Sequence, residues 1–299
     1  MSRIHEALKK AEQEKAAQVP ISERRRDTPS TSNVATLISD KRSIEETPQP
    51  GRQADRSSGL RFEDLVQRCA RPEWKSDSAL RVSLAGDSGK IVAERFRTLR
   101  SRLYQIAGTR ALKRVLITSS LPAEGKTFVA TNLVRSIIRQ ADRRVLMIDA
   151  DLRAPRLHTA LGAPSTPGLA DYLKGEADEY SIVQYSALNN LCFIPCGTKA
   201  TNPSELLLSD RMKALLDTIT PAFDWVILDS PPALPVHDSS SLADLCDGVL
   251  FVVRAGQTSH EDAKKASMEF RHKNMLGSVL NRVESLESPG GYYYGHSEK

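Results

Sequence analysis

RVLITSSLPAEGKT, residues 114–127, is a short apolar run that leads directly into a Gly-Lys-Thr turn. A turn of this kind between a strand and a helix is typical of the phosphate-binding loop (P-loop) of nucleotide-binding proteins. Backbone N–H groups of such a loop converge on phosphate oxygens. Lys126 would add positive charge at the β- and γ-phosphates, and the Thr127 hydroxyl would reach Mg²⁺. We therefore expect nucleotide contacts from seven consecutive residues: Pro122, Ala123, Glu124, Gly125, Lys126, Thr127 and Phe128.

Two positions of this loop depart from the usual pattern. Ser120 stands where the first glycine is usual, and Ala123 occupies a position that a second glycine would fit easily. An alanine there requires either a negative φ or some backbone strain. The alternative interpretation of the stretch is an ordinary helix start that carries a lysine and a threonine.

The chain after this loop alternates short apolar runs with amphipathic stretches. Helical spacing extends from the loop to about residue 140 and recurs over residues 204–218 and 260–273. The apolar runs occupy residues 143–151, 191–195, 224–232, 247–255 and 276–281. This alternation predicts an α/β fold, a mostly parallel sheet with helices on both faces. Together with the loop it predicts a P-loop NTPase domain over residues 80–285.

Three acidic residues end two of these runs. Asp149 and Asp151 close the run at 143–151, and Asp229 lies near the end of the run at 224–232. Ligands of open parallel sheets lie beyond the carboxyl ends of the strands, so these carboxylates would face the P-loop. There they can hold a hydrated Mg²⁺ directly or through water. Any one of them alone would more often cap a helix or a turn.

These residues resemble the motifs of the bacterial tyrosine kinases of capsule and exopolysaccharide export, the BY-kinases, over about residues 80–295. That family carries a P-loop, a motif φφφDxDxR and a motif φφφDxxP. They are matched here by SLPAEGKT (residues 120–127), LMIDADLR (146–153) and VILDSPP (226–232). NPSELL (202–207) also resembles a family segment.

A fourth family motif, ExxRxxR, precedes the P-loop and mediates ring-like self-assembly. It is matched by Glu94, Arg97 and Arg100, which fall close to one face of a helix. The plain alternative for these charges is a solvated helix face.

The resemblance implies protein-tyrosine autokinase activity with ATP and Mg²⁺. Lys126 and the metal would spread the charge of the transferring phosphoryl group. Thr127, Asp151 and Asp229 would hold or orient the metal, and Asp149 would orient or accept the proton of the tyrosine hydroxyl. The roles of the three acids can be permuted. Asn281 matches a position that often contacts adenine in such folds.

The stretch GYYYG, residues 291–295, would supply the substrate in a flexible tail, residues 286–299. The resemblance implies that Tyr292, Tyr293 and Tyr294 enter the active site of a neighbouring copy in the ring. It also implies a role in polysaccharide polymerisation and export. The partner would be a membrane chain-length regulator whose cytoplasmic tail docks on this chain. The alternative for the three rings is packing on the domain surface.

Composition favours a cytoplasmic protein, and the resemblance implies that its partner recruits it to the inner face of the cell membrane. The apolar runs are far too short to span a bilayer, and the N-terminus lacks an apolar signal region. The net charge of +5 is concentrated in residues 61–110. Aromatic residues are scarce there, which favours a solvated or protein-binding face over nucleic acid.

The first 58 residues are expected to stand apart from the folded domain. Residues 1–16 predict a short amphipathic helix. Residues 17–58 are rich in Pro, Ser, Thr, Arg and Glu and predict a disordered linker. The opening MSRIHEALKKAEQEK resembles kinases tied to exosortase-type polysaccharide loci.

Two other functions remain open. A partitioning-type ATPase switch would bind a membrane or partner without phosphorylating tyrosine, but such proteins carry a signature lysine where Leu121 stands. A non-enzymatic scaffold would bind ATP and gate polysaccharide assembly. Phosphotyrosine detection after incubation with labelled ATP separates the first from a kinase, and normal assembly by a Lys126 variant would support the second.

Overall fold

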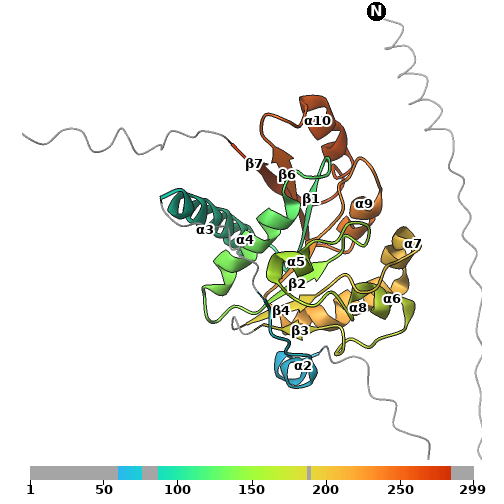
Figure 1. The fold of residues 1–299 in the computed structure, drawn as a ribbon. Helices are drawn as coiled ribbons and strands as arrows, with labels where there is room; N and C mark the ends of the chain where they lie inside the picture. The colour runs from blue at the N-terminus through green and yellow to red at the C-terminus, as the bar shows by residue number, and fades with distance from the viewer. Residues whose placement is uncertain (1–59, 76–86, 187–189, 284–299) are drawn as a thin grey trace, which may run out of the picture. The chain divides into compact units, whose positions relative to one another are not determined.

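The computed structural model describes residues 60–75, 87–186 and 190–283, all within one compact unit, residues 54–299. In these residues a seven-stranded sheet has the order β3-β4-β2-β5-β1-β6-β7 (Figure 1). Its strands are β1 (Arg114–Ser119), β2 (Val145–Asp149), β3 (Gln184–Tyr185), β4 (Leu191–Ile194), β5 (Trp225–Asp229), β6 (Gly248–Arg254) and β7 (Met275–Asn281). Only the β3–β4 pair among them is antiparallel. The mostly parallel sheet predicted from the sequence is confirmed.

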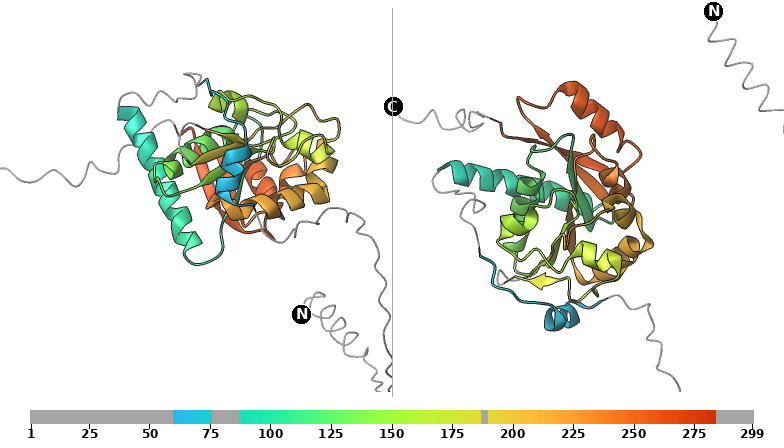
Figure 2. Two further views of the ribbon diagram at one scale, coloured as in Figure 1. Left: turned by 90° about the horizontal axis from the view of Figure 1, so that it is seen from below. Right: turned by 45° about the vertical axis from the view of Figure 1, so that its right-hand side comes forward.

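One face of the sheet is covered by α3 (Asp87–Ala107), α4 (Lys126–Ile138) and α5 (Leu157–Leu161), as Figures 1 and 2 show. Successive strand residues point to opposite faces. The side chains that fill this layer include Val115, Ile117 and Met147 from the strands, Phe96 and Leu103 from α3, and Leu133 and Ile137 from α4.

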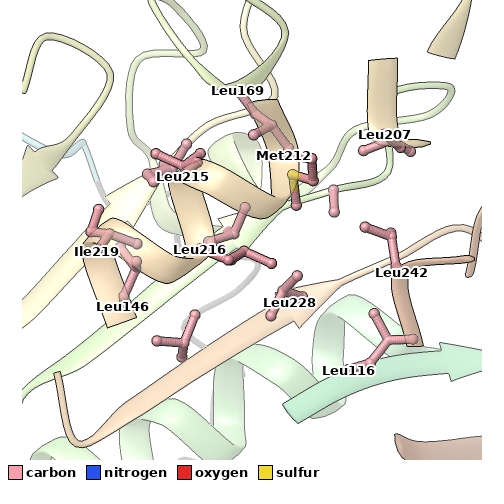
Figure 3. Close-up of a cluster of buried hydrophobic side chains, with 14 of the residues drawn as sticks. Leu116, Leu146, Leu169, Leu207, Met212, Leu215, Leu216, Ile219, Leu228 and Leu242 are labelled. Carbon is pink, nitrogen blue, oxygen red and sulfur yellow. The ribbon is translucent and has the colours of Figure 1, made fainter. Parts of the chain in front are cut away.

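The opposite face is covered by the remaining helices. These are α2 (Phe62–Arg68), α6 (Leu169–Lys174), α7 (Pro203–Leu208), α8 (Asp210–Ile219), α9 (Asp238–Ala243) and α10 (His260–Met268). Figure 3 shows α8 lying over the sheet, with Ile219 beside Leu146 and Leu216 beside Leu228. Because both faces are covered, β2 and β5 are buried along their whole length, which is why they read as unbroken apolar runs.

The fold begins before the predicted boundary at residue 80. In α2, Phe62 and Leu65 pack into the core under the sheet, and the Phe62 ring meets Phe223 edge to face at 5.6 Å. The N–H of Ala70 also donates to the carbonyl of Val183, which ties the segment to β3. The local basic excess at 61–110 therefore lies on elements of the fold rather than just before it. Residues 1–58 and 286–299 lie outside the described residues.

The predicted helix over 204–218 is two helices. Ser209 is extended (φ −69°, ψ 152°), and its hydroxyl donates to the carbonyl of Leu206 at 2.7 Å, so α7 ends there and α8 begins at Asp210. The break turns Leu207 and Met212 into the core from two directions.

The predicted helix over 260–273 ends early, at Met268. The following residues form tight turns that bring Phe270 onto Phe251, with ring centroids 6.2 Å apart. Within the described ranges, no helix combines the length and hydropathy that crossing a lipid bilayer would require.

Candidate active site

The P-loop follows β1 and ends at the first residue of α4, as the sequence predicts. The residues directly before and after Glu124 have left-handed backbone conformations: Ala123 with φ 63° and Gly125 with φ 96°. Of the two possibilities for Ala123, backbone strain is therefore the one the loop adopts. The positive φ favours glycine at position 125, and a Cβ atom there would lie 2.1 Å from Nδ2 of Asn281 and displace that side chain.

Lys126 and Thr127 occupy the first turn of α4, directly after β1. The thirteen-residue helix points its free N–H groups and the positive end of its dipole towards the loop. Thr127 Oγ1 donates to Oδ2 of Asp229 at the end of β5, at 2.6 Å. Burial raises the pKa of the Asp229 carboxyl, and the positive charge of Lys126 offsets part of that rise. The phosphate-binding turn and the acidic edge are thus in direct contact.

Asp149 and Asp229 are opposite each other in the register of β2 and β5. Both are fully buried or nearly so, at 0% and 1% exposure. Burial raises the pKa of Asp229 to about 6, partly offset by Lys126 and by the Thr127 hydrogen bond. Burial, then the neighbouring Asp229 charge, raises the pKa of Asp149 well above its ordinary value. The structure therefore brings together two of the three predicted acids as a coupled pair.

One carboxylate oxygen of Asp149 accepts a hydrogen bond, and the other has no partner among the described residues. Its Oδ2 accepts from the N–H of Leu157 at 3.0 Å, which fixes the start of α5. Its Oδ1, Oδ1 of Asp229 and the hydroxyl of Ser120 are buried and find no hydrogen-bond partner among the described residues. These unpaired polar atoms belong to the strand ends and the loop that surround the expected phosphate position.

Asp151 lies in the loop after β2, where its Oδ1 accepts from the N–H of Ala154 at 3.0 Å. It contributes to the raised pKa of both Asp149 and Asp229 and therefore stands close to them. It is thus placed with the other two acids, while one oxygen shapes its own turn.

The site fits a small hard cation. Carboxylate and hydroxyl oxygens are the ligands that Mg²⁺ prefers, and unpaired carboxylate oxygens from neighbouring strands suit it. No group of three or more His, Cys, Asp or Glu side chains in the described part of the chain forms a metal cage by itself. A site that relies on one or two carboxylates, a hydroxyl, waters and substrate phosphates is the usual arrangement for Mg²⁺.

A polar cluster missed by sequence analysis borders the acids. Arg153 Nε donates to Oδ2 of Asp238 at 2.8 Å, and its guanidinium also donates to the Ser204 hydroxyl at 2.8 Å. Ser204 in turn donates to Oδ1 of Asp238 at 2.6 Å. The cluster joins the loop after β2 to α7 and α9. Asp238 is preceded by no distinctive motif, so only its position at a helix start could have marked it.

Asn281 is the last residue of β7. Its Nδ2 donates to the backbone carbonyl of Glu124 at 2.8 Å. Asn281 therefore touches the P-loop directly. Its predicted contact with adenine stays a prediction.

The three residues of the predicted assembly motif lie on α3 but point differently. Arg97 forms an ion pair with Glu94 on the exposed helix surface. Arg100 instead donates to the backbone carbonyl of Ser136 in α4. The motif thus presents one charged pair to the outside and uses one arginine to hold α3 on α4. The predicted substrate tyrosines, Tyr292, Tyr293 and Tyr294, lie outside the described residues.

A hollow among the described residues is remote from these groups. It measures about 720 Å³ and lies at the amino-terminal edge of the sheet, between Tyr104, Arg114 and Trp225. Arg114 is already bonded to Asp217, Thr220 and the carbonyl of Leu216. The hollow is thus bordered by groups that serve the fold, and the chemistry lies at the opposite edge.

Comparison with known proteins gives one consistent result. The family model described as "AAA domain" matches residues 122–271. The chain is 37% identical over 204 residues to the tyrosine-protein kinase YwqD of Bacillus subtilis, a match covering 67% of this chain and 86% of YwqD. It is 32% identical over 231 residues to the tyrosine-protein kinase etk of Escherichia coli, covering 77% of this chain but only 31% of etk.

A solved structure agrees with these relatives. The crystal structure of the chimerical protein CapA2B2 superposes with a TM-score of 0.64 at 28% identity, covering 74% of this chain and 99% of that one. The P-loop and acidic edge described above fall within the segment matched by the family model, apart from Ser120, Leu121 and Asn281.

Proposed function

The chain belongs to the bacterial tyrosine kinases, and from this premise we propose that it transfers the γ-phosphoryl group of ATP to Tyr292, Tyr293 and Tyr294 of a neighbouring copy. The observation that carries the proposal is the contact between the P-loop and the acidic edge, made by Thr127 and Asp229. It places a phosphate-binding turn beside buried carboxylates that can serve a hydroxyl nucleophile.

The residues of the site divide the work between holding ATP and activating the tyrosine. Backbone N–H groups from Gly125 to Thr127 would bind the phosphates, and Lys126 would stabilise negative charge on the transferring group. Thr127, Asp151 and Asp229 would hold Mg²⁺, which when bound neutralises charge on the phosphate oxygens. Each contact is expected to strengthen as charge shifts towards the transition state.

Asp149 is the proposed proton acceptor. A tyrosine hydroxyl has an ordinary pKa of about 10, so a carboxylate with a raised pKa is a better base for it than an ordinary one. The free Oδ1 of Asp149 supplies the acceptor atom. In the transfer, the tyrosine oxygen bonds to the γ-phosphorus as the bond to ADP breaks, and the hydroxyl proton passes to Asp149.

The biological role follows from the kinase relatives. We propose that phosphorylation regulates polysaccharide polymerisation and export, through a membrane chain-length regulator that recruits the chain to the inner membrane face. The exposed pair of Glu94 and Arg97 would contribute to a ring-like homo-oligomer. Each phosphate would add about −1.5 to −2 charge to the tail, and several would favour dissociation of the ring.

A mixing experiment tests both the reaction and its direction. One variant, Lys126→Met, keeps the tail but lacks the phosphate-binding lysine. The other carries Tyr292→Phe, Tyr293→Phe and Tyr294→Phe and keeps the active site. After incubation with γ-labelled ATP and Mg²⁺, mass spectrometry should find tail phosphate on the Lys126→Met chain only in the mixture. A wild-type protein that hydrolyses ATP without gaining phosphotyrosine would instead support an ATPase switch.

A further inference from the structure

Glu124 lies in the middle of the P-loop, and its side chain is bonded within the protein. It is 2% exposed. Its Oε2 accepts from the N–H of Leu121 at 2.9 Å, and its Oε1 accepts from the hydroxyl of Thr258. Both carboxylate oxygens are therefore engaged by the protein. The Glu124 carboxylate therefore has no free oxygen with which to bind a metal ion or a nucleotide.

The same residue is held on its other side through its backbone. The Glu124 carbonyl accepts from Nδ2 of Asn281 at 2.8 Å. The carbonyl of Asn281 accepts from the N–H of Ala255 at 2.9 Å, and Thr258 accepts from the N–H of Arg254 at 3.2 Å. These contacts close a hydrogen-bonded ring through the P-loop, the end of β6 and the end of β7.

The ring supports a strained stretch of backbone. Ala123 and Gly125, on either side of Glu124, have φ values of 63° and 96°. A non-glycine residue in this region costs of order 1–3 kcal/mol and persists only where its surroundings over-determine it. A buried carboxylate is likewise costly unless hydrogen bonds satisfy it. The loop thus carries a strained residue at Ala123 beside a buried carboxylate whose burial is offset by its hydrogen bonds, just before the N–H groups of Lys126 and Thr127.

We propose that Glu124 is a positioning residue that fixes the P-loop in its phosphate-binding shape, with Thr258 as its essential partner. Its carboxylate joins the loop start at Leu121 to Thr258, and this sets the direction of the N–H groups that follow Gly125. Thr258 thereby acts on the nucleotide site without touching the nucleotide. The inference rests on the proposed nucleotide site and adds residues outside the P-loop to it.

The test measures binding of ADP with Mg²⁺ to the full chain by isothermal titration calorimetry. Glu124→Ala should raise the Kd for ADP by about tenfold or more, and Thr258→Val should raise it by several-fold. Each substitution removes a hydrogen bond that holds the P-loop in its phosphate-binding conformation. Glu124→Gln should stay within about threefold of wild type. Its amide oxygen can accept from Leu121, and its amide N–H can donate to Thr258.

Two further variants separate positioning from general destabilisation. Thr98→Val is the matched control, because the Thr98 hydroxyl also donates a hydrogen bond, to the carbonyl of Glu94, but lies on the exposed face of α3. Its Kd should equal that of wild type. The double variant Glu124→Ala with Thr258→Val should bind ADP no more weakly than Glu124→Ala alone, because the two substitutions remove the same hydrogen bond. Thr258→Val should unfold at a lower temperature than Thr98→Val, because it leaves Oε1 of the buried Glu124 without its donor. ADP binding is therefore measured well below both unfolding midpoints, which keeps the test valid if Glu124→Ala folds poorly.

Opposite results would overturn the proposal. Wild-type affinity in Thr258→Val would remove its partner role, and equal weakening in Glu124→Gln and Glu124→Ala would assign the effect to charge instead of position. ADP binding needs no phosphoryl transfer, so these outcomes differ from failure of the proposed kinase reaction, which would appear as absent phosphotyrosine with normal ADP binding. A wild type that does not bind ADP would overturn both.

Discussion

Oγ1 of Thr127 donates to Oδ2 of Asp229 at 2.6 Å, linking residues 102 positions apart in the sequence. The bond orients the carboxylate so that its other oxygen stays unpaired among the described residues. Thr127→Val keeps the shape of the side chain and removes the hydroxyl. Removing one such preorganised group should lower kcat/KM for ATP by about 10²-fold. Thr127→Ser should retain most activity, and equal rates for the two variants would contradict the role of the hydroxyl.

Lys126 is the second test of the site. Lys126→Met should abolish tyrosine phosphorylation, because no other cation of the P-loop reaches the phosphate position. The fold should persist, since the side chain lies at the edge of the core with 9% exposure and methionine fills similar space. Circular dichroism and size-exclusion chromatography check the fold. Autophosphorylation that survives in this variant contradicts the scheme.

The pKa of Asp229 predicts how stability depends on pH. Its pKa rises from 3.8 to about 6 on folding, chiefly through burial. The folded protein therefore binds this proton more tightly than the unfolded chain, and stability falls as pH rises from about 4 to about 6. Above pH 6 the full penalty of about 3 kcal/mol applies. Asp229→Asn removes it, so the variant should gain stability over wild type across this interval.

Urea unfolding between pH 4 and pH 8, with a chelator and without nucleotide, measures the difference in free energy of unfolding between Asp229→Asn and wild type. It should grow up to about pH 6 and then level off. A difference that stays constant with pH would show that Asp229 is already ionised in the folded protein at low pH. Added Mg²⁺ should reduce the penalty, because it binds the deprotonated form.

The elements of the site could be predicted from sequence, but their pairing could not. Burial on both faces makes β2 and β5 continuous apolar runs, and the P-loop carries its own glycine and lysine, so local pattern locates them. The opposition of Asp149 and Asp229 depends on strand order and register. These are set by contacts between distant segments, which no local pattern records.

The errors have the same physical origin. Ser209 breaks a pattern whose apolar spacing alone predicts one helix, because its hydroxyl satisfies the carbonyl of Leu206. The cluster of Arg153, Ser204 and Asp238 joins residues up to 85 positions apart. Helix α2 was missed because its seven residues carry too little periodicity to separate from the polar stretch before them.

The place of α2 in the core predicts where the domain can be cut. A chain starting at residue 59 should unfold cooperatively like the full chain. A chain starting at residue 80 loses Phe62 and Leu65, both buried among core residues, and should be several kcal/mol less stable. Leu65→Ala in the full chain should cost about 2–5 kcal/mol. Equal stability of the two truncated chains would show that α2 is dispensable to the fold.

The two arginines of α3 should separate assembly from folding. Arg97 is half exposed, and its one ion pair within the described ranges is with Glu94. Exposed pairs contribute about 0–1 kcal/mol, so Arg97→Glu should leave the free energy of unfolding nearly unchanged. Light scattering should nevertheless show loss of the oligomer if this face builds the ring. Arg100→Ala should lower stability by about 1–2 kcal/mol, because its guanidinium holds the carbonyl of Ser136.

Arg102→Glu is the matched control for this pair of variants, because Arg102 is an exposed arginine of the same helix outside the motif. The same charge change at Arg102 should leave the oligomer intact. If both charge reversals dissociate it, the oligomer depends on the net charge of α3. If neither does, the contact between copies lies elsewhere, and the charged pair of Glu94 and Arg97 is a solvated helix face.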